Sequence, residues 1–196
     1  MIIGISGKIG AGKTELARIL YTHFGYEPKI FAGKLKTIAA ILTGTTESEQ
    51  YNRRGKDRYL EDWDMTIGEF QQRLGTDAVR NGLHQDAWVL ALFADYKGTE
   101  DWSISDVRFR NEAGMITDMG GIMVRIDGSR TGPGNRDPNH SSETELDNYE
   151  FHYRFTNDGT REKLVEHAHR IHRLARCDNM DEWRELVGKY GSPTML

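Results

Sequence analysis

The chain begins MIIGISGKIGAGKT, residues 1–14, and this stretch decides the fold. It starts with a short apolar run typical of a buried strand, formed by Ile2, Ile3 and Ile5. A glycine-rich turn follows, and Lys13 and Thr14 then open a segment with helical spacing of its apolar residues, Leu16, Ala17, Ile19 and Leu20. A strand, a glycine turn and a helix in this order begin a βαβ unit, so the stretch predicts an α/β protein.

The turn matches the pattern G-x-x-x-x-G-K-[ST], which forms a phosphate-binding loop (P-loop) between a strand and a helix. Glycines let the backbone point successive N–H groups at phosphate oxygens, and the helix N-terminus adds partial positive charge. Lys13 can reach the β- and γ-phosphates, and the Thr14 hydroxyl can ligate Mg²⁺. A chance glycine turn would not require the flanking strand and helix, so we predict an ATP-binding loop of Gly7, Gly10, Ala11, Gly12, Lys13 and Thr14.

The composition of the 196-residue chain points to a single domain. The 26 basic and 30 acidic residues give a net charge of −4, which argues against a stable nucleic-acid partner because such domains usually carry a basic excess. Cys177 is the only cysteine, so we expect no disulfide framework, no thiolate metal site and a reducing cytoplasm. No apolar run approaches the ~20 residues that span a bilayer, and no signal peptide is visible, so no membrane partner is expected.

Apolar segments that alternate with helical patterns predict a mostly parallel sheet with helices on both faces. Five strands are expected, near 2–6, 27–31, 102–107, 122–126 and 152–156. Helices are expected near 34–42, after a T-x-x-E capping box at Thr66, and near 84–96, 111–119, 142–147, 160–175 and 181–189. The remaining parts of this single domain (1–196) are a polar insertion at about 43–64, expected as a loop with one short helix, a lid at about 127–147 and a tail at 176–196.

Polar residues follow three of the predicted strands. The P-loop follows the first strand, Asp106 closes the third, and Asn157 follows the last. Ligands bind at the carboxyl ends of parallel strands, so these residues are expected to converge on one cleft, with Asn157 near ATP. Asp106 can hold Mg²⁺ or bind a substrate hydroxyl, and Arg108 can grip a second phosphate. The alternative is an ordinary aspartate at a strand end, paired with its neighbouring arginine.

The segment 127–139, DGSRTGPGNRDPN, is too rich in glycine, proline and asparagine for regular structure. It carries Arg130 and Arg136, and phosphoryl transfer depends on charge neutralisation by such side chains. We therefore predict a lid whose two arginines are catalytic, with a plain surface loop as the alternative.

Three further groups of residues have more than one interpretation. Arg73, Asp77 and Arg80 can form a solvated helix face with ion pairs or can anchor a substrate phosphate. Lys34 and Lys36 are equally ambiguous when considered alone. The helix near 160–175 carries His167, His169 and His172, and we expect a surface cluster rather than a metal site because no cysteine or carboxylate completes a zinc ligand set.

Taken together, these residues resemble the deoxynucleoside monophosphate kinases of tailed phages, within the P-loop nucleoside-monophosphate kinases. The resemblance covers residues 1 to about 175 and is most specific at LGTD (residues 74–77) with its downstream Trp88 and at the D-x-R-x-x-x-E spacing of Asp106, Arg108 and Glu112. It also includes FAGKLK (31–36), H-x-S-E from His140 and NDG from Asn157.

The resemblance implies a three-layer P-loop kinase fold and transfer of the γ-phosphoryl group of ATP, with Mg²⁺, to a deoxynucleoside 5′-monophosphate. Lys13, Arg108, Arg130 and Arg136 are the expected catalytic residues, and Thr14 and Asp106 the expected metal ligands. The acceptor pocket maps onto Lys36, Gly75, Trp88, Asp106, Arg108 and Glu112. It also implies the host cytoplasm if a phage encodes the chain, and leaves a homodimer open.

One departure from the family pattern concerns the acceptor phosphate. Many relatives carry an arginine where this chain has Gly68 and Glu69, so Arg73, Arg80 or the pair at 53–54 must supply that charge, or the phosphate is held more weakly.

Three other functions compete with this interpretation. A kinase for another small acceptor, of the dephospho-coenzyme A or sugar-acid type, shares the fold and the P-loop. A GTPase-type switch is disfavoured because no suitable lysine accompanies Asn157 in an N-K-x-D-like motif. A kinase that acts on nucleic-acid ends is disfavoured by the acidic charge balance.

Overall fold

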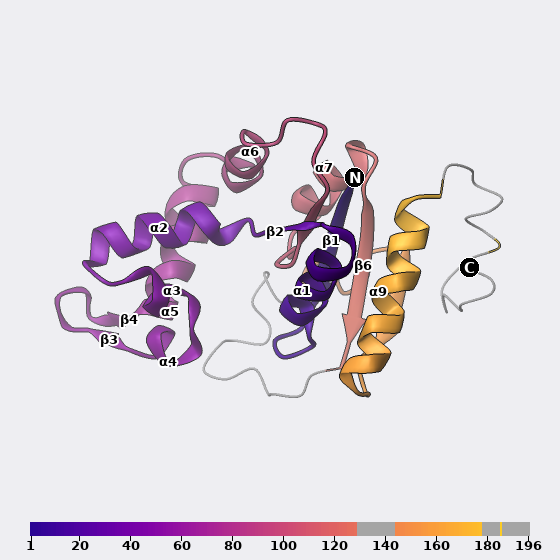
Figure 1. Ribbon diagram of the computed structural model, residues 1–196. Helices are drawn as coiled ribbons and strands as arrows, with labels where there is room; N and C mark the ends of the chain where they lie inside the picture. Colours follow the sequence, from indigo (N-terminus) through magenta and orange to yellow (C-terminus); the bar gives the residue numbers. More distant parts are fainter. Residues whose placement is uncertain (129–143, 178–184, 186–196) are drawn as a thin grey trace. The chain divides into compact units, whose positions relative to one another are not determined.

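The structure, a computed structural model, describes residues 1–128, 144–177 and 185 (Figure 1). Its contacts divide the chain into two compact units. We call the first, Met1–Lys29 with Lys97–Leu196, the P-loop unit, and the second, Ile30–Tyr96, the helical unit. Most of the predicted lid and the last predicted helix lie outside the described residues, and the single-domain assignment stays a prediction.

The P-loop unit is built on a five-stranded parallel sheet in the order β2-β5-β1-β6-β7. Its strands are β1 (Ile2–Gly7), β2 (Glu27–Lys29), β5 (Trp102–Ile104), β6 (Ile122–Asp127) and β7 (Tyr153–Thr156). All five predicted strands are present, and β2 and β5 are shorter than expected. The prediction of an α/β fold with a mostly parallel five-stranded sheet is confirmed.

Helices cover both faces of this sheet. On one face, α1 (Lys13–Phe24) and α9 (Arg161–Ala175) pack against alternate strand residues such as Ile5 and Val124. On the other face lies α7 (Arg110–Asp118), and a Cβ at Gly4 would come within 2.8 Å of Ile116 of that helix. Burial of each aliphatic side chain stabilises the fold by roughly 1.5–3 kcal/mol, so the two layers fix the position of the sheet edge that carries the P-loop.

The helical unit consists of short elements. They are α2 (Ala32–Thr43), α3 (Glu47–Tyr51), α4 (Arg53–Lys56), a hairpin of β3 (Tyr59–Leu60) and β4 (Met65–Thr66) around the 3₁₀ turn η1 (Glu61–Trp63), α5 (Ile67–Gln72), the π-helix η2 (Arg73–Asn81) and α6 (Ala87–Phe93). The prediction of a loop with one short helix at 43–64 was therefore wrong. A capping box at Thr46 and Glu49 starts α3. The buried Gln71 amide of α5 then donates to two oxygens of Gln50 in α3, the side-chain oxygen at 2.6 Å and the main-chain oxygen at 2.9 Å.

The capping box predicted at Thr66 is present. Its hydroxyl accepts from the Glu69 N–H, and the Glu69 carboxylate accepts from the Thr66 N–H at 2.7 Å. The helix that it starts changes to π geometry at Arg73, which the apolar spacing did not predict. Within the described ranges, no helix is both long and apolar enough to span a membrane.

Candidate active site

The P-loop connects β1 to α1, and its glycines have conformations that other residues rarely adopt. Gly10 and Gly12 have φ angles of 77° and 104°, and Gly12 caps the N-terminus of α1. A Cβ at Gly7 would lie 2.5 Å from the carbonyl oxygen of Ile126. The loop therefore needs glycine at these positions, and the helix N-terminus that it leads into is the end of a helix that attracts anions.

Lys13 lies at the first position of α1, with its ammonium held inside the loop. Its Nζ donates to the carbonyl oxygens of Gly7 at 2.6 Å and Lys8 at 2.8 Å. These contacts place the charge of Lys13 beside the N-terminus of α1, where a phosphate would meet both.

Asn157 follows β7 and supports the P-loop from beside it. Its Nδ2 donates to the carbonyl oxygen of Ala11 at 2.8 Å, and a Cβ at Gly12 would lie 2.5 Å from the same nitrogen. The structure thus shows Asn157 as a support of the loop backbone. Direct contact with ATP stays a prediction for this residue.

The segment between β5 and α7 carries Asp106, Arg108 and Glu112. The Glu112 carboxylate is buried and accepts from the main-chain N–H groups of Arg108 at 2.8 Å and Phe109 at 3.1 Å. This side chain therefore fixes the start of α7, and its place in the acceptor pocket stays a prediction. Asp106 and Arg108 are half-buried on the loop that Glu112 holds.

The predicted convergence of these segments follows from the strand pairing. β1 pairs in parallel with both β5 and β6, and β6 pairs in parallel with β7. The P-loop, the 106–112 segment and Asn157 therefore all leave the carboxyl edge of one sheet. This is the edge where open parallel sheets bind their ligands.

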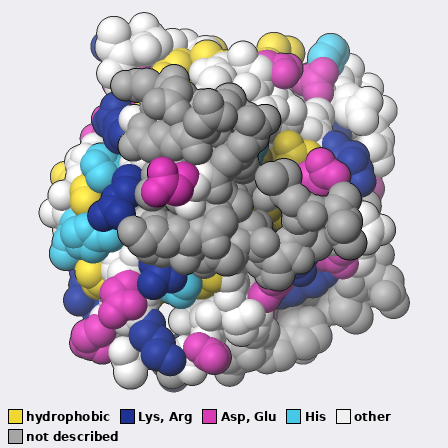
Figure 2. Space-filling view, turned by 90° about the vertical axis from the view of Figure 1, so that its right-hand side faces the viewer, with side chains coloured by type: hydrophobic (Ala, Val, Ile, Leu, Met, Phe, Trp, Pro, Cys, Tyr) yellow, Lys and Arg dark blue, Asp and Glu magenta, His cyan; other side chains and the backbone are white. Residues whose placement is uncertain are grey.

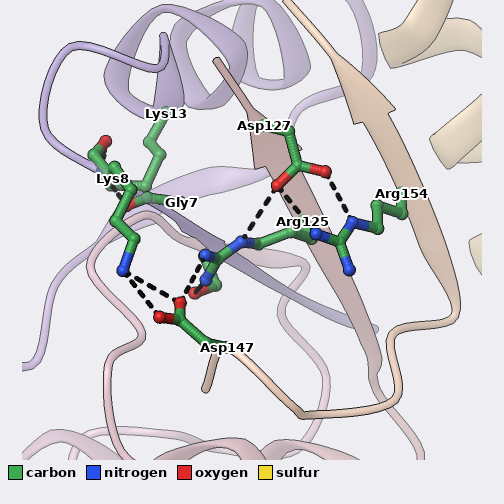
Figure 3. Close-up of polar contacts among 8 residues, drawn as sticks. Gly7, Lys8, Lys13, Arg125, Asp127, Asp147 and Arg154 are labelled. Atoms are coloured by element: carbon green, nitrogen blue, oxygen red, sulfur yellow. Dashed lines mark hydrogen bonds and ion pairs between the residues drawn. The ribbon is translucent and has the colours of Figure 1, made fainter. Parts of the chain in front are cut away.

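A network of five charged residues next to the P-loop was not predicted (Figure 3). It contains Lys8, Arg125, Asp127, Asp147 and Arg154. Arg154 donates to both carboxylate oxygens of Asp127, with Nε at 2.5 Å and Nη2 at 3.1 Å. The available signal was an arginine inside the apolar segment IMVRID, because a charge in a strand covered on both faces must be paired.

The acceptor residues predicted in the helical unit make contacts within that unit. The Lys36 ammonium lies over the Tyr51 ring, 3.9 Å from its centroid. Trp88 is 6% exposed, and its indole N–H donates to the Gly75 carbonyl at 2.8 Å. Most of the Trp88 ring is therefore covered within the helical unit, and its place in the acceptor pocket stays a prediction. Its visible role is to hold the backbone of the LGTD segment within η2.

The structure also shows contacts of Arg80 and Lys34, whose roles the sequence left open. Arg80 is buried and donates to the Gln85 carbonyl at 3.2 Å, so the stripe with Arg73 and Asp77 is not a uniformly solvated face. Lys34 forms an ion pair with Asp95 at 2.9 Å.

Two of the three histidines of α9 are more embedded than expected. Figure 2 shows histidines together with lysines and arginines on one side of the face where α9 lies. The His167 ring stacks on the Phe155 ring, with centroids 3.9 Å apart, and the His172 ring on the Phe24 ring, with centroids 4.2 Å apart. Burial lowers the pKa of both side chains. No group of three or more His, Cys, Asp or Glu side chains in the described part of the chain can hold a metal ion.

Thr14 and Asp106, the predicted Mg²⁺ ligands, offer a hydroxyl and a carboxylate oxygen. Thr14 is exposed in the first turn of α1, and Asp106 is half-buried after β5. Mg²⁺ prefers such oxygen donors and is usually held by one or two protein groups together with phosphate oxygens and water. The donor set therefore fits Mg²⁺ carried by a nucleotide.

Comparisons with known proteins point to one family. The family model described as Deoxynucleotide monophosphate kinase matches residues 13–168. A relative from Acanthamoeba polyphaga mimivirus, named "Putative deoxynucleotide monophosphate kinase", is 31% identical over 161 residues, which cover 74% of this chain and 82% of the relative. Together the two matches support a kinase, that is, a phosphotransferase.

A solved structure also aligns with most of the chain. It is a gluconokinase from Sinorhizobium meliloti 1021, with a TM-score of 0.47 and 18% sequence identity, over 88% of this chain and 92% of that chain.

Proposed function

The chain belongs to the deoxynucleotide monophosphate kinase family, and we propose that it transfers the γ-phosphoryl group of ATP to a deoxynucleoside 5′-monophosphate, giving ADP and the diphosphate. The observation that carries the proposal is the sheet edge that brings the P-loop and the Asp106–Arg108 segment together. One segment suits the donor phosphates, and the other suits the acceptor phosphate.

On the donor side, the P-loop N–H groups and Lys13 bind the β- and γ-phosphates. Thr14 and Asp106 would hold Mg²⁺, which neutralises charge on the phosphates when bound. Lys13 already lies at the N-terminus of α1, and Asn157 keeps the Ala11 peptide in place. This preorganisation lowers the cost of stabilising the charge that develops during transfer.

On the acceptor side, Arg108 binds the phosphate of the monophosphate, and Asp106 positions the sugar or the metal ion. Lys36 of the helical unit is retained as an acceptor residue from the family resemblance. Glu112 holds the segment that carries both Asp106 and Arg108. Gly75 and Trp88 form a second part of the pocket, in which Trp88 acts through the Gly75 carbonyl. We retain Gly75, Trp88 and Glu112 as pocket residues, with these supporting roles added.

The reaction needs no strong base, because the attacking oxygen belongs to a phosphate that is already anionic. Catalysis then depends on alignment and on positive charge around the transferred group. Arg130 and Arg136, which lie outside the described residues, are proposed to supply part of that charge. The single cysteine suits a reducing cytoplasm as the place of this reaction.

A panel assay tests the function. ADP formation from ATP is measured with each deoxynucleoside monophosphate, each ribonucleoside monophosphate, gluconate and dephospho-coenzyme A. We expect turnover with one or more deoxynucleoside monophosphates. Turnover confined to gluconate or dephospho-coenzyme A would replace the proposal with a kinase for another small acceptor.

A further inference from the structure

Asp147 lies between a P-loop side chain and a buried arginine of the sheet (Figure 3). Its carboxylate accepts from Lys8 Nζ at 2.9 Å and from Arg125 Nη2 at 2.9 Å. The residue belongs to a turn in which the Asp147 N–H donates to the Thr144 carbonyl. Leu146, next to it, is 3% exposed and anchors this turn in the core.

Arg125 is the fixed end of this arrangement. Its side chain is only 7% exposed, and its Nη1 donates to the hydroxyl of Ser6, the neighbouring residue on β1. A buried guanidinium needs a counter-charge, and Asp147 supplies one at hydrogen-bond distance. Burial acts to raise the pKa of Asp147, but hydrogen bonds from Lys8 and Arg125 outweigh it and the pKa is lowered. The carboxylate is therefore ionised at neutral pH.

Lys8 is the exposed end of this arrangement. Its ammonium is bound by Asp147, while its carbonyl oxygen is one of the two main-chain acceptors of Lys13 Nζ, at 2.8 Å. The contacts thus run from Arg125 through Asp147 and the side chain of Lys8 to the peptide that holds Lys13. None of these residues except Lys13 was expected to serve the reaction.

We propose that Asp147 is a positioning residue: by tying Lys8 to Arg125 it fixes the peptide that holds Lys13 in place for the nucleotide phosphates. The proposal rests on the proposed phosphotransferase function, because it requires a nucleotide that binds at the P-loop. It does not depend on which acceptor is phosphorylated. Without the Asp147 contacts the Lys8 peptide has more conformational freedom. Binding of Mg-ATP must then order this peptide, and the affinity for Mg-ATP falls.

The test compares two aspartates that each pair with two cations. Asp147→Asn removes the charge beside the P-loop. Asp101→Asn is the matched control, because Asp101 pairs with the N-terminal ammonium at 2.9 Å and with Arg176 at the amino end of the sheet. We expect both variants to lower the thermal stability, and only Asp147→Asn to raise the Kd for Mg-ATP and lower kcat, each by roughly 3- to 10-fold.

A double-mutant cycle with Lys8→Gln shows whether the effect passes through Lys8. This variant keeps the Asp147–Arg125 pair, so it tests the tie even if Asp147→Asn does not fold. We expect Lys8→Gln to weaken Mg-ATP binding by a similar factor, and Asp147→Asn to add less than twofold in its presence. Fully additive effects would overturn the proposal.

Two other results would also overturn the proposal. One is a folded Asp147→Asn variant with wild-type Kd and kcat, which would make the network purely structural. The other is tighter Mg-ATP binding by Asp147→Asn, which would mean that Asp147 competes with the phosphates for Lys8. Nucleotide binding needs no acceptor, so a wild-type protein that binds Mg-ATP but phosphorylates no deoxynucleotide would refute the proposed function and still allow this test.

Discussion

The two units of the chain hold their functional residues in opposite ways. The P-loop unit carries its proposed phosphate-binding loop at the edge of a sheet covered on both faces, and main-chain N–H groups are the expected phosphate contacts of such a loop. The helical unit holds short helices together with individual side-chain bonds, such as Trp88 to Gly75 and Gln71 to Gln50. Binding of a phosphate common to all nucleotides is suited to a fixed backbone. Selection of an acceptor is suited to a unit like the helical unit, because the substitution of one side chain there alters a single contact.

The largest effect is expected at Lys13. Lys13→Ala removes the ammonium that lies in the loop and should lower kcat by about 10²- to 10³-fold, because its charge serves the transferring phosphates. The protein should remain folded, since Lys13 lies at the end of the loop, outside the apolar core of the P-loop unit. Steady-state kinetics and circular dichroism provide the check, with the exposed Lys97→Ala as control. Wild-type turnover by folded Lys13→Ala would remove the P-loop from the mechanism.

The second largest effect is expected at Arg108, whose substitution should affect binding of the monophosphate and leave binding of ATP unchanged. Arg108→Ala should raise the KM for the monophosphate roughly 10- to 100-fold and leave the KM for ATP nearly unchanged, because a charge-assisted contact contributes about 1.5–3 kcal/mol. Arg110→Ala is the matched control: its side chain is exposed on the same segment, and its N–H still donates to Glu145. A higher KM for ATP with an unchanged monophosphate KM would place Arg108 on the donor side.

Trp88 tests the helical unit with a smaller change. Trp88→Phe keeps a buried ring but removes the hydrogen bond to the Gly75 carbonyl, at a cost of about 1–3 kcal/mol in stability. The KM for the monophosphate should rise a few-fold while ATP binding stays unchanged. The matched control is Trp102→Phe, at a buried tryptophan of β5 in the P-loop unit. Equal effects of the two variants on the monophosphate KM would contradict the proposed place of Trp88 in the acceptor pocket.

The smallest effect concerns stability below neutral pH and belongs to the P-loop unit. Burial lowers the pKa of His152, His167 and His172 below the ordinary value of 6.5. The unfolded chain then binds protons first as the pH falls, so the free energy of unfolding is unaffected by these groups above about pH 6.5 and decreases below it. Each pKa unit of difference contributes at most about 1.4 kcal/mol.

Urea unfolding between pH 5 and 8 measures this decrease. His167→Gln should make the plot of unfolding free energy against pH flatter, because the variant lacks a titrating imidazole at this position. In the wild type, protonation of Nδ1 would prevent it from accepting a hydrogen bond from the Tyr153 hydroxyl, which lies 2.8 Å away. His169→Gln, at an exposed position of the same helix, is the control. A stability that rises as the pH falls from 6.5 would contradict the buried state of these rings.

The sequence predicted the parts of the fold that follow from local patterns. The apolar runs located all five strands, and the glycine turn before Lys13 located the P-loop. The hairpin at 59–66 was missed because its two-residue strands have no readable alternation, and the π-helix at 73–81 because its spacing resembles that of an α-helix.

The side-chain partners within the site were beyond the reach of sequence patterns. Asp147 meets Lys8 across 139 positions of sequence, and only the folded sheet brings them together. Glu112 and Trp88 were identified as pocket residues from the family resemblance. Their bonds to main-chain groups became visible only in three dimensions.

The most direct test of the central claim follows the phosphoryl group itself. Wild-type protein is incubated with ATP labelled at the γ-phosphate and with the preferred deoxynucleoside monophosphate, and the labelled products are separated. We predict label in the β-phosphate of the deoxynucleoside diphosphate, formed about 10²- to 10³-fold more slowly by Lys13→Ala. Label that appears only as inorganic phosphate, at a rate independent of the monophosphate, would contradict it and indicate a nucleotide-hydrolysing switch.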